Sequence, residues 1–224
     1  MTIADKALEL VHEGTVIGLG TGRAAVEFVR ALGARVRQGL RVTGVPTSEA
    51  TRALADQLGI PLTTLDRVDQ LDATFDGADE VAPNLDLLKG YGGALVREKV
   101  VAASSKRLII LVGPGKVVAA LGSRGKLPVE VVPFGLPLAA RRLRELGLDP
   151  VLRLGPDGRE PFLSDNGQSI LDCRTGPIAD PSALETAIEA IPGVVGTGLF
   201  LGLAETVLIQ ADDGSVEVRH RGGA

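Results

Sequence analysis

The sequence is poor in the residues that most often build metal and nucleic-acid sites. Its 224 residues include one cysteine, two histidines and no tryptophan, and aromatic residues make up only 3%. A single cysteine excludes an intramolecular disulfide and a four-cysteine zinc site. So few aromatic rings also disfavour a surface on which bases stack. These absences argue against a metal-centred protein and against a nucleic-acid partner.

Basic charge and long apolar runs are missing as well. The formal net charge is −4, which offers no basic footprint for nucleic acid. The longest apolar runs, at 108–112 and 194–203, are far shorter than the ~20 residues of a membrane-spanning helix. The first residues open directly into a helical pattern and lack the composition of a signal or transit peptide. We therefore expect a cytoplasmic protein with no membrane partner.

Glycine, in contrast, is abundant and clustered. Many of the 29 glycines follow apolar strands, where a missing side chain lets the backbone approach a ligand closely. These clusters are Gly18, Gly20 and Gly22; Gly77; Gly90, Gly92 and Gly93; and Gly113 and Gly115.

The first half of the chain alternates between helical and strand periodicity. Apolar residues recur with helical spacing over 3–13, 23–38, 48–58 and 94–104, and apolar strands cover 15–19, 41–45, 71–75 and 107–112. Ser48 is expected to open the third of these helices. This alternation predicts βαβ units and a parallel sheet covered by helices on both faces.

The pattern changes near residue 127. A strand at 127–133 precedes a helix at 136–147, short strands near 151–154, 162–163 and 169–172, and a helix at 181–190 capped by Asp180. We expect strands at 198–201, 206–210 and 215–219 to rejoin the first sheet. The sequence thus predicts a small α+β domain at 127–199, inserted into a main domain formed by 1–126 and 200–224.

The first candidate site is the segment Gly18-Leu19-Gly20-Thr21-Gly22-Arg23-Ala24-Ala25. It ends a strand and opens a helix, so its backbone N–H groups would favour phosphate or another anion. A dinucleotide site is the main rival, but the second strand ends without the acidic residue that binds a ribose, and the lysine of a P-loop is also missing. A tight turn without a ligand is the remaining alternative.

The second candidate is Asp76-Gly77-Ala78-Asp79-Glu80, which follows an apolar strand. Two carboxylates at the carboxyl edge of a parallel sheet lie where open α/β folds bind ligands. A capped turn accounts for the same residues, since aspartate is common in turns. A metal site would need a further ligand, for which Glu80 and Asp86 are the candidates.

The third candidate is the glycine-rich loop from Lys89 to Gly93, which leads into a helix that carries Glu98. On its own, Glu98 would be an ordinary solvated helix residue. Parallel topology, however, brings strand-end loops to one edge, and together they supply an anion site, carboxylates and a lysine. Those groups suit proton abstraction beside a carbonyl, with a carboxylate base and donors for the developing enediolate.

In this order and spacing, the motifs resemble those of the A-type ribose-5-phosphate isomerase family. The resemblance rests on Gly20-Thr21-Gly22, on Asp76-Gly77-Ala78-Asp79, on Lys89 to Ala94 with Glu98, and on Leu127-Pro128-Val129-Glu130-Val131. The later segments Asp165-Asn166-Gly167, Ile170-Leu171-Asp172 and Ile191 to Phe200 are also similar, so the likeness covers nearly the whole chain.

The resemblance implies an aldose–ketose isomerase that acts on a sugar phosphate without a metal or other cofactor. It implies that Glu98 accepts the proton, and that Asp76, Asp79 and Lys89 bind and polarise the sugar oxygens. It implies a Rossmann-like main domain with a small α+β (ferredoxin-like) insert, and a homo-oligomer, with a dimer favoured. The expected substrate contacts are Thr21, Gly22, Arg23, Ala24, Asp76, Gly77, Ala78, Asp79, Lys89, Gly90, Tyr91, Gly92 and Lys116.

This chain departs from the family pattern at a few positions and leaves two other function classes open. Arg23 and Ala24 stand where hydroxyl residues are usual, and Tyr91 replaces a glycine. One alternative is a sugar-phosphate sensor, although such domains normally accompany a helix-turn-helix, for which this chain has no room. The other is an acyl- or CoA-transferase relative with a glutamate nucleophile; the two aspartates and the lysine argue against it.

Overall fold

The computed structural model describes residues 1–222, which divide into two compact units. The first unit comprises Met1–Ala78, Arg97–Val117 and the chain from Gly202 on, and the second comprises Asp79–Val96 and Val118–Leu201. Within residues 1–222, no helix has both the length and the apolar character to span a membrane.

A six-stranded sheet forms the centre of the first unit, in the order β13-β12-β6-β3-β1-β2. The strands run parallel except for β13, which pairs antiparallel with β12 at one edge. The predicted parallel sheet is therefore confirmed, with an antiparallel strand added. Its strands are β1 (Val16–Leu19), β2 (Thr43–Pro46), β3 (Ala73–Asp76), β6 (Leu108–Val112), β12 (Ala204–Gln210) and β13 (Val216–His220).

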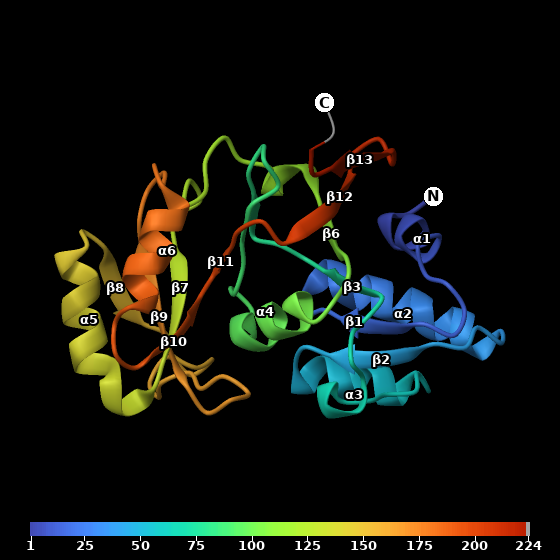
Figure 1. Cartoon of the computed structure of the whole chain (residues 1–224), viewed down its shortest axis with the longest axis horizontal. Helices are drawn as coiled ribbons and strands as arrows, with labels where there is room; N and C mark the ends of the chain where they lie inside the picture. Colours follow the sequence, from blue (N-terminus) through green and yellow to red (C-terminus); the bar gives the residue numbers. More distant parts are fainter. Residues whose placement is uncertain (223–224) are drawn as a thin grey trace. The chain divides into compact units, whose positions relative to one another are not determined.

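Both faces of this sheet are covered by helices, as expected (Figure 1). On one face, Phe28 of α2 stacks on Phe75 of β3, with 4.4 Å between ring centroids. On the other face, Gly18 lies against Val101 of α4, where a Cβ at residue 18 would be 2.7 Å from its Cγ1. The helices are α1 (Ile3–Leu8), α2 (Arg23–Arg37), α3 (Glu49–Gln57) and α4 (Leu95–Ala103), with short 3-10 turns η1 (Leu65–Arg67) and η2 (Pro114–Lys116).

The second unit contains a four-stranded antiparallel sheet in the order β10-β7-β9-β8. Its elements are β7 (Leu127–Val131), η3 (Pro133–Gly135), α5 (Leu136–Glu145), β8 (Asp149–Leu152), β9 (Ser169–Arg174), α6 (Pro181–Glu189) and β10 (Val194–Thr197). Apart from η3, this is the β-α-β-β-α-β succession of ferredoxin-like domains, so the predicted α+β (ferredoxin-like) class is confirmed. Asp180 caps α6 by accepting the N–H of Ala183.

One prediction for the last strands is wrong. The segment expected at 198–201 forms β11 (Leu199–Phe200), which pairs with β5 (Leu87–Leu88) instead of joining the large sheet. With β4 (Glu80–Val81) these strands make a three-stranded sheet. The second unit includes 79–96, which carries β4 and β5, and 118–126, whereas the sequence predicts its start at 127. The strand predicted near 162–163 is reduced to isolated bridges.

Candidate active site

The candidate residues of the first unit follow the carboxyl ends of its parallel strands. Residues 20–22 come after β1, Thr47 and Ser48 after β2, residues 76–78 around the end of β3, and Lys116 in η2 after β6. Parallel strands present their carboxyl ends at one edge, where open α/β folds bind ligands. The topology of the first unit thus brings these residues to the carboxyl edge of its sheet, as expected.

Asp76 is fixed by backbone donors at this edge. It is 1% exposed, and its Oδ1 accepts the N–H of Thr21 at 3.1 Å and the N–H of Gly77 at 2.7 Å. A Cβ at Gly20 would lie 2.3 Å from Oδ1 and 2.6 Å from the Asp76 Cα. The close approach of Asp76 therefore requires a glycine at position 20. A capped turn accounts for the bond from the Gly77 N–H to Asp76 but not for the bond from the Thr21 N–H, which comes from another strand end.

The hydroxyl of Thr21 joins a cluster that sequence reasoning missed. It lies 2.7 Å from the Thr47 hydroxyl and donates to Ser48 Oγ at 2.8 Å. Thr51, one turn into α3, donates to the Gly20 carbonyl at 2.9 Å. The signal for it in the sequence is the pair of hydroxyl residues Thr47-Ser48 after the second strand, of which only Ser48 is predicted to have a role, as a helix cap.

The start of α2 has the form of an anion site. Gly22 is its N-cap, with φ +102° and no side chain to accept the first N–H groups, and the helix runs for 15 residues. Arg23, the first helical residue, is exposed, and Ala24 is partly buried. Unsatisfied N–H groups and the positive helix end favour an anion such as phosphate.

Glu98 is not the solvated helix residue that its sequence alone would suggest. It is 4% exposed and lies one turn before Val101, the residue of α4 that packs against Gly18. Residues three apart share one face of a helix, so Glu98 lies on the face that covers the sheet. Its neighbour Arg97 pairs with Glu49 of α3 at 2.7 Å.

The second unit carries Asp79 and the loop from Lys89 to Gly93. The N–H of Tyr91 donates to Asp79 Oδ2 at 3.0 Å. Lys89 is 2% exposed; its N–H donates to the Gly198 carbonyl at 2.8 Å, and its Nζ lies 5.5 Å from the centre of the Phe200 ring. Burial, together with the nearby carboxylates Glu80 and Asp79, raises the pKa of Tyr91 to about 12. The tyrosine therefore carries its proton at neutral pH.

Glu80, the further metal ligand considered above, has a structural role. It is fully buried, and its two oxygens accept the N–H groups of Gly122 at 2.6 Å and Arg124 at 2.7 Å. Across residues 1–222, no group of three histidine, cysteine, aspartate or glutamate side chains is arranged to hold a metal ion. The alternative that Glu80 completes a metal site is therefore not supported.

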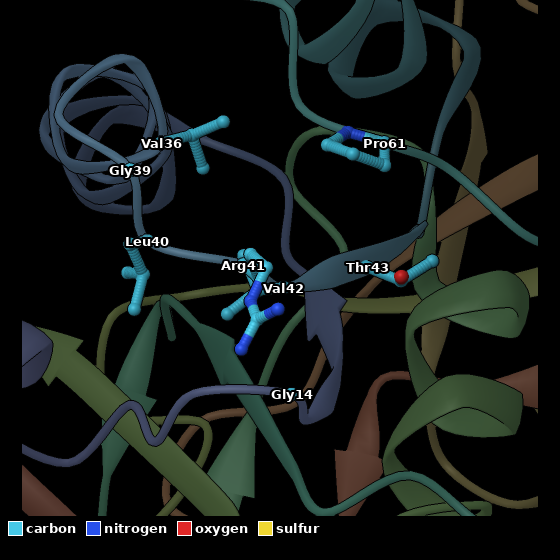
Figure 2. Close-up of a pocket in the computed structure, with 8 residues that line it drawn as sticks. All are labelled: Gly14, Val36, Gly39, Leu40, Arg41, Val42, Thr43 and Pro61. Carbon is cyan, nitrogen blue, oxygen red and sulfur yellow. The ribbon is translucent and has the colours of Figure 1, made fainter.

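A pocket in the first unit lies at the opposite edge of its sheet from residues 20–22 and 76–78. It is lined at the amino end of β2 and the carboxyl end of α2 by Gly14, Val36, Gly39, Leu40, Arg41, Val42, Thr43 and Pro61 (Figure 2). Its one charged side chain, Arg41, pairs with Glu13 at 2.8 Å. This lining is mostly apolar and offers no carboxylate, so the pocket does not suit proton transfer.

The fold and its buried strand-end carboxylates define a Rossmann-like α/β protein with a ferredoxin-like insert. The family model of ribose 5-phosphate isomerase A (phosphoriboisomerase A) matches residues 43–214. The "Ribose-5-phosphate isomerase A" of Roseiflexus castenholzii is 55% identical over 217 residues, covering 96% of this chain and 92% of that protein. The chain belongs to the ribose 5-phosphate isomerase A family.

Solved structures agree with this assignment. The ribose 5-phosphate isomerase A of Methanocaldococcus jannaschii is 42% identical, with a TM-score of 0.93 over 98% of this chain and 96% of that one. A D-ribose-5-phosphate isomerase in complex with phospho-erythronic acid is 36% identical, with a TM-score of 0.94 over 97% and 96%. The predicted family and fold class, and the prediction of an isomerase, are confirmed.

Proposed function

We propose that this chain interconverts D-ribose 5-phosphate and D-ribulose 5-phosphate through an enediolate, as a step of the non-oxidative pentose phosphate pathway. The observation that carries the proposal is Glu98, a glutamate buried on the sheet-facing side of α4 in a chain of this family. A relative in complex with phospho-erythronic acid, a phosphorylated four-carbon acid, supports a sugar-phosphate substrate.

Glu98 is the proposed base. Aldose–ketose conversion moves one proton between C1 and C2 of the open-chain sugar, and a single carboxylate can take it from one carbon and return it to the other. Burial keeps bulk water from the carboxylate and so reduces loss of the proton to solvent during transfer.

Asp76, Asp79 and Lys89 are proposed to bind and polarise the sugar oxygens. Asp76 is oriented by the backbone N–H groups of Thr21 and Gly77, and Asp79 by that of Tyr91. The Lys89 ammonium supplies positive charge to the oxygens on which the enediolate charge develops. Groups already oriented before substrate binds need little rearrangement during the reaction.

The phosphate is proposed to bind at the start of α2. Thr21, Gly22, Arg23 and Ala24 contribute backbone N–H groups, and the Arg23 guanidinium adds a charge-assisted donor. Lys116 is a further proposed substrate-binding cation. The backbone of two further segments completes the proposed contacts, at Gly77 and Ala78 and at Gly90, Tyr91 and Gly92. No metal or other cofactor is required by this scheme.

An isomerase assay tests the proposal. Purified protein is mixed with ribose 5-phosphate, and ketose formation is followed with and without exhaustive chelation of divalent ions. We expect turnover at the same rate in both. A protein that binds the sugar phosphate without turnover would be a sensor, and turnover that needs an added divalent ion would assign Asp76 and Asp79 to a metal.

Assembly and location remain predictions. We propose a homodimer that works in the cytoplasm. Light scattering of the purified protein at several concentrations would measure its mass and distinguish a dimer from a tetramer or monomer.

A further inference from the structure

Arg153 lies immediately after β8 and contacts the loop that follows Lys89. Its side chain is only 10% exposed. Its Nη1 donates to the carbonyl of Gly90 at 3.0 Å and to that of Tyr91 at 3.2 Å. The remaining nitrogens are taken by Asp172: Nε donates to Oδ2 at 3.0 Å, and Nη2 to Oδ1. One planar guanidinium thus connects a strand-borne carboxylate with two loop carbonyls.

Asp172, the carboxylate that binds Arg153, is itself held in place and stays ionised. It lies within β9, whose neighbours are β7 and β8, and the Lys126 ammonium also donates to its Oδ2, at 2.9 Å. Burial alone would raise the pKa of Asp172, but Arg153 and Lys126 together hold it below its ordinary value. The carboxylate therefore keeps its charge at neutral pH, and the guanidinium is held on the sheet.

The loop from Lys89 to Gly93, which Arg153 contacts, is rich in glycine and so has few side chains that could hold it in one conformation. Gly90 and Gly93 have positive φ angles of +105° and +84°, and glycine loses the most conformational freedom when it is ordered. Arg153 binds the oxygen of the Gly90–Tyr91 peptide, and the N–H of the same peptide, that of Tyr91, donates to Asp79. Lys126 adds a second contact, its ammonium lying 4.8 Å from the centre of the Tyr91 ring.

We propose that Arg153, anchored by Asp172, is a positioning residue that orients Lys89 and Asp79 by clamping the carbonyls of the 90–91 segment. The inference rests on the proposed roles of Lys89 and Asp79 in the reaction. Misplacing a reacting or polarising group by about 1 Å can cost around 100-fold in rate. Removing the clamp is therefore expected to lower kcat/KM by roughly tenfold to 100-fold.

The test compares Arg153→Ala with Arg174→Ala, a matched control at the exposed end of β9. Each variant is assayed for kcat and KM with ribose 5-phosphate, for competitive inhibition by inorganic phosphate, and for thermal unfolding. For Arg153→Ala we expect lowered kcat/KM, an unchanged inhibition constant for phosphate, and recovery of activity on adding guanidinium ion. Arg153→Lys should retain part of the activity, because one ammonium cannot replace the planar three-nitrogen fork. Arg174→Ala should match the wild type.

Two results would overturn the inference. Arg153→Ala with kcat/KM within twofold of the wild type would show that the loop needs no clamp. Equal losses of activity, phosphate binding and cooperative unfolding, without guanidinium rescue, would show that Arg153 only stabilises the fold. Lys89→Met separates this inference from the proposed function. If Lys89→Met is inactive and Arg153→Ala is not, only the clamp fails; if Lys89→Met is fully active, the role of Lys89 itself fails.

Discussion

The backbone N–H of Thr21 donates to the Oδ1 of Asp76 at 3.1 Å and so ties the loop after β1 to the end of β3. The two strands are paired in register up to Leu19 and Phe75, so the bond extends their pairing past the edge of the sheet. The proposed phosphate loop and a proposed sugar-binding carboxylate therefore hold each other in place, and a change in one should disturb the other.

Gly20→Ala tests this coupling. The new Cβ would lie 2.6 Å from the Asp76 Cα, which is backbone and cannot rotate away. Strain of this kind usually costs about 1–3 kcal/mol, and we expect a lower melting temperature together with at least a tenfold loss of kcat/KM. Gly155→Ala is the control, because its Cβ would meet atoms only at 3.6 Å. Wild-type activity in Gly20→Ala would show that the position of Asp76 does not matter.

Arg23→Ala measures the contribution of the guanidinium to phosphate binding. Arg23 is exposed at the first position of α2, and a hydrogen bond to a charged group contributes about 1.5–3 kcal/mol. We therefore expect KM to rise by roughly tenfold to 100-fold with little change in kcat. Arg30→Ala, at an exposed site farther along α2, should leave KM unchanged. The same KM in Arg23→Ala would mean that the backbone N–H groups alone hold the phosphate.

Asp172→Asn should change how stability depends on pH. The pKa of Asp172 lies below its ordinary 3.8, so its charged form stabilises the fold. A lowered pKa contributes stability above about pH 4 that is lost as the pH falls below it. The melting temperature of the variant should thus be lowest relative to the wild type at neutral pH, and the difference should shrink toward about pH 3. Asp56→Asn, at an exposed site in α3, provides the comparison; a pH-independent deficit for Asp172→Asn would contradict the prediction.

Periodicity was enough for the parts of the fold that depend on long, regular elements. The alternation of apolar strands with amphipathic helices predicted the parallel sheet, and local chemistry located the start of α6 at Asp180. The candidate site was found by its types of residue, since glycines, carboxylates and a lysine followed strand ends. Glu98 was harder, because sequence alone does not show which face of α4 covers the sheet.

The rest depends on contacts between residues far apart in the sequence. The two-residue strands β4, β5 and β11 are too short to show a period, and their pairing became visible only in the fold. Arg153 is 63 residues from Gly90, whose carbonyl it binds, and no spacing rule connects them. The role of Thr47 cannot be read from its own segment, because it depends on the hydroxyl of Thr21, which follows a different strand.

Glu98→Gln is the decisive test of the mechanism. The amide keeps the shape and much of the hydrogen bonding of the buried carboxylate but cannot accept the proton from the sugar. General-base catalysis typically contributes about 10²–10⁴ in rate, so kcat should fall by at least 100-fold. Inhibition by phospho-erythronic acid and the thermal unfolding should stay close to the wild type, because binding and fold do not need the base.

Glu27→Gln, on the exposed face of α2, controls for the substitution itself. In deuterated water the wild type should place deuterium on the carbon that receives the proton, to the extent that the Glu98 proton exchanges before it is returned. A Glu98→Gln protein with near wild-type turnover would exclude Glu98 as the base, and Asp76, the other buried carboxylate of the proposed set in the first unit, would be the next to test.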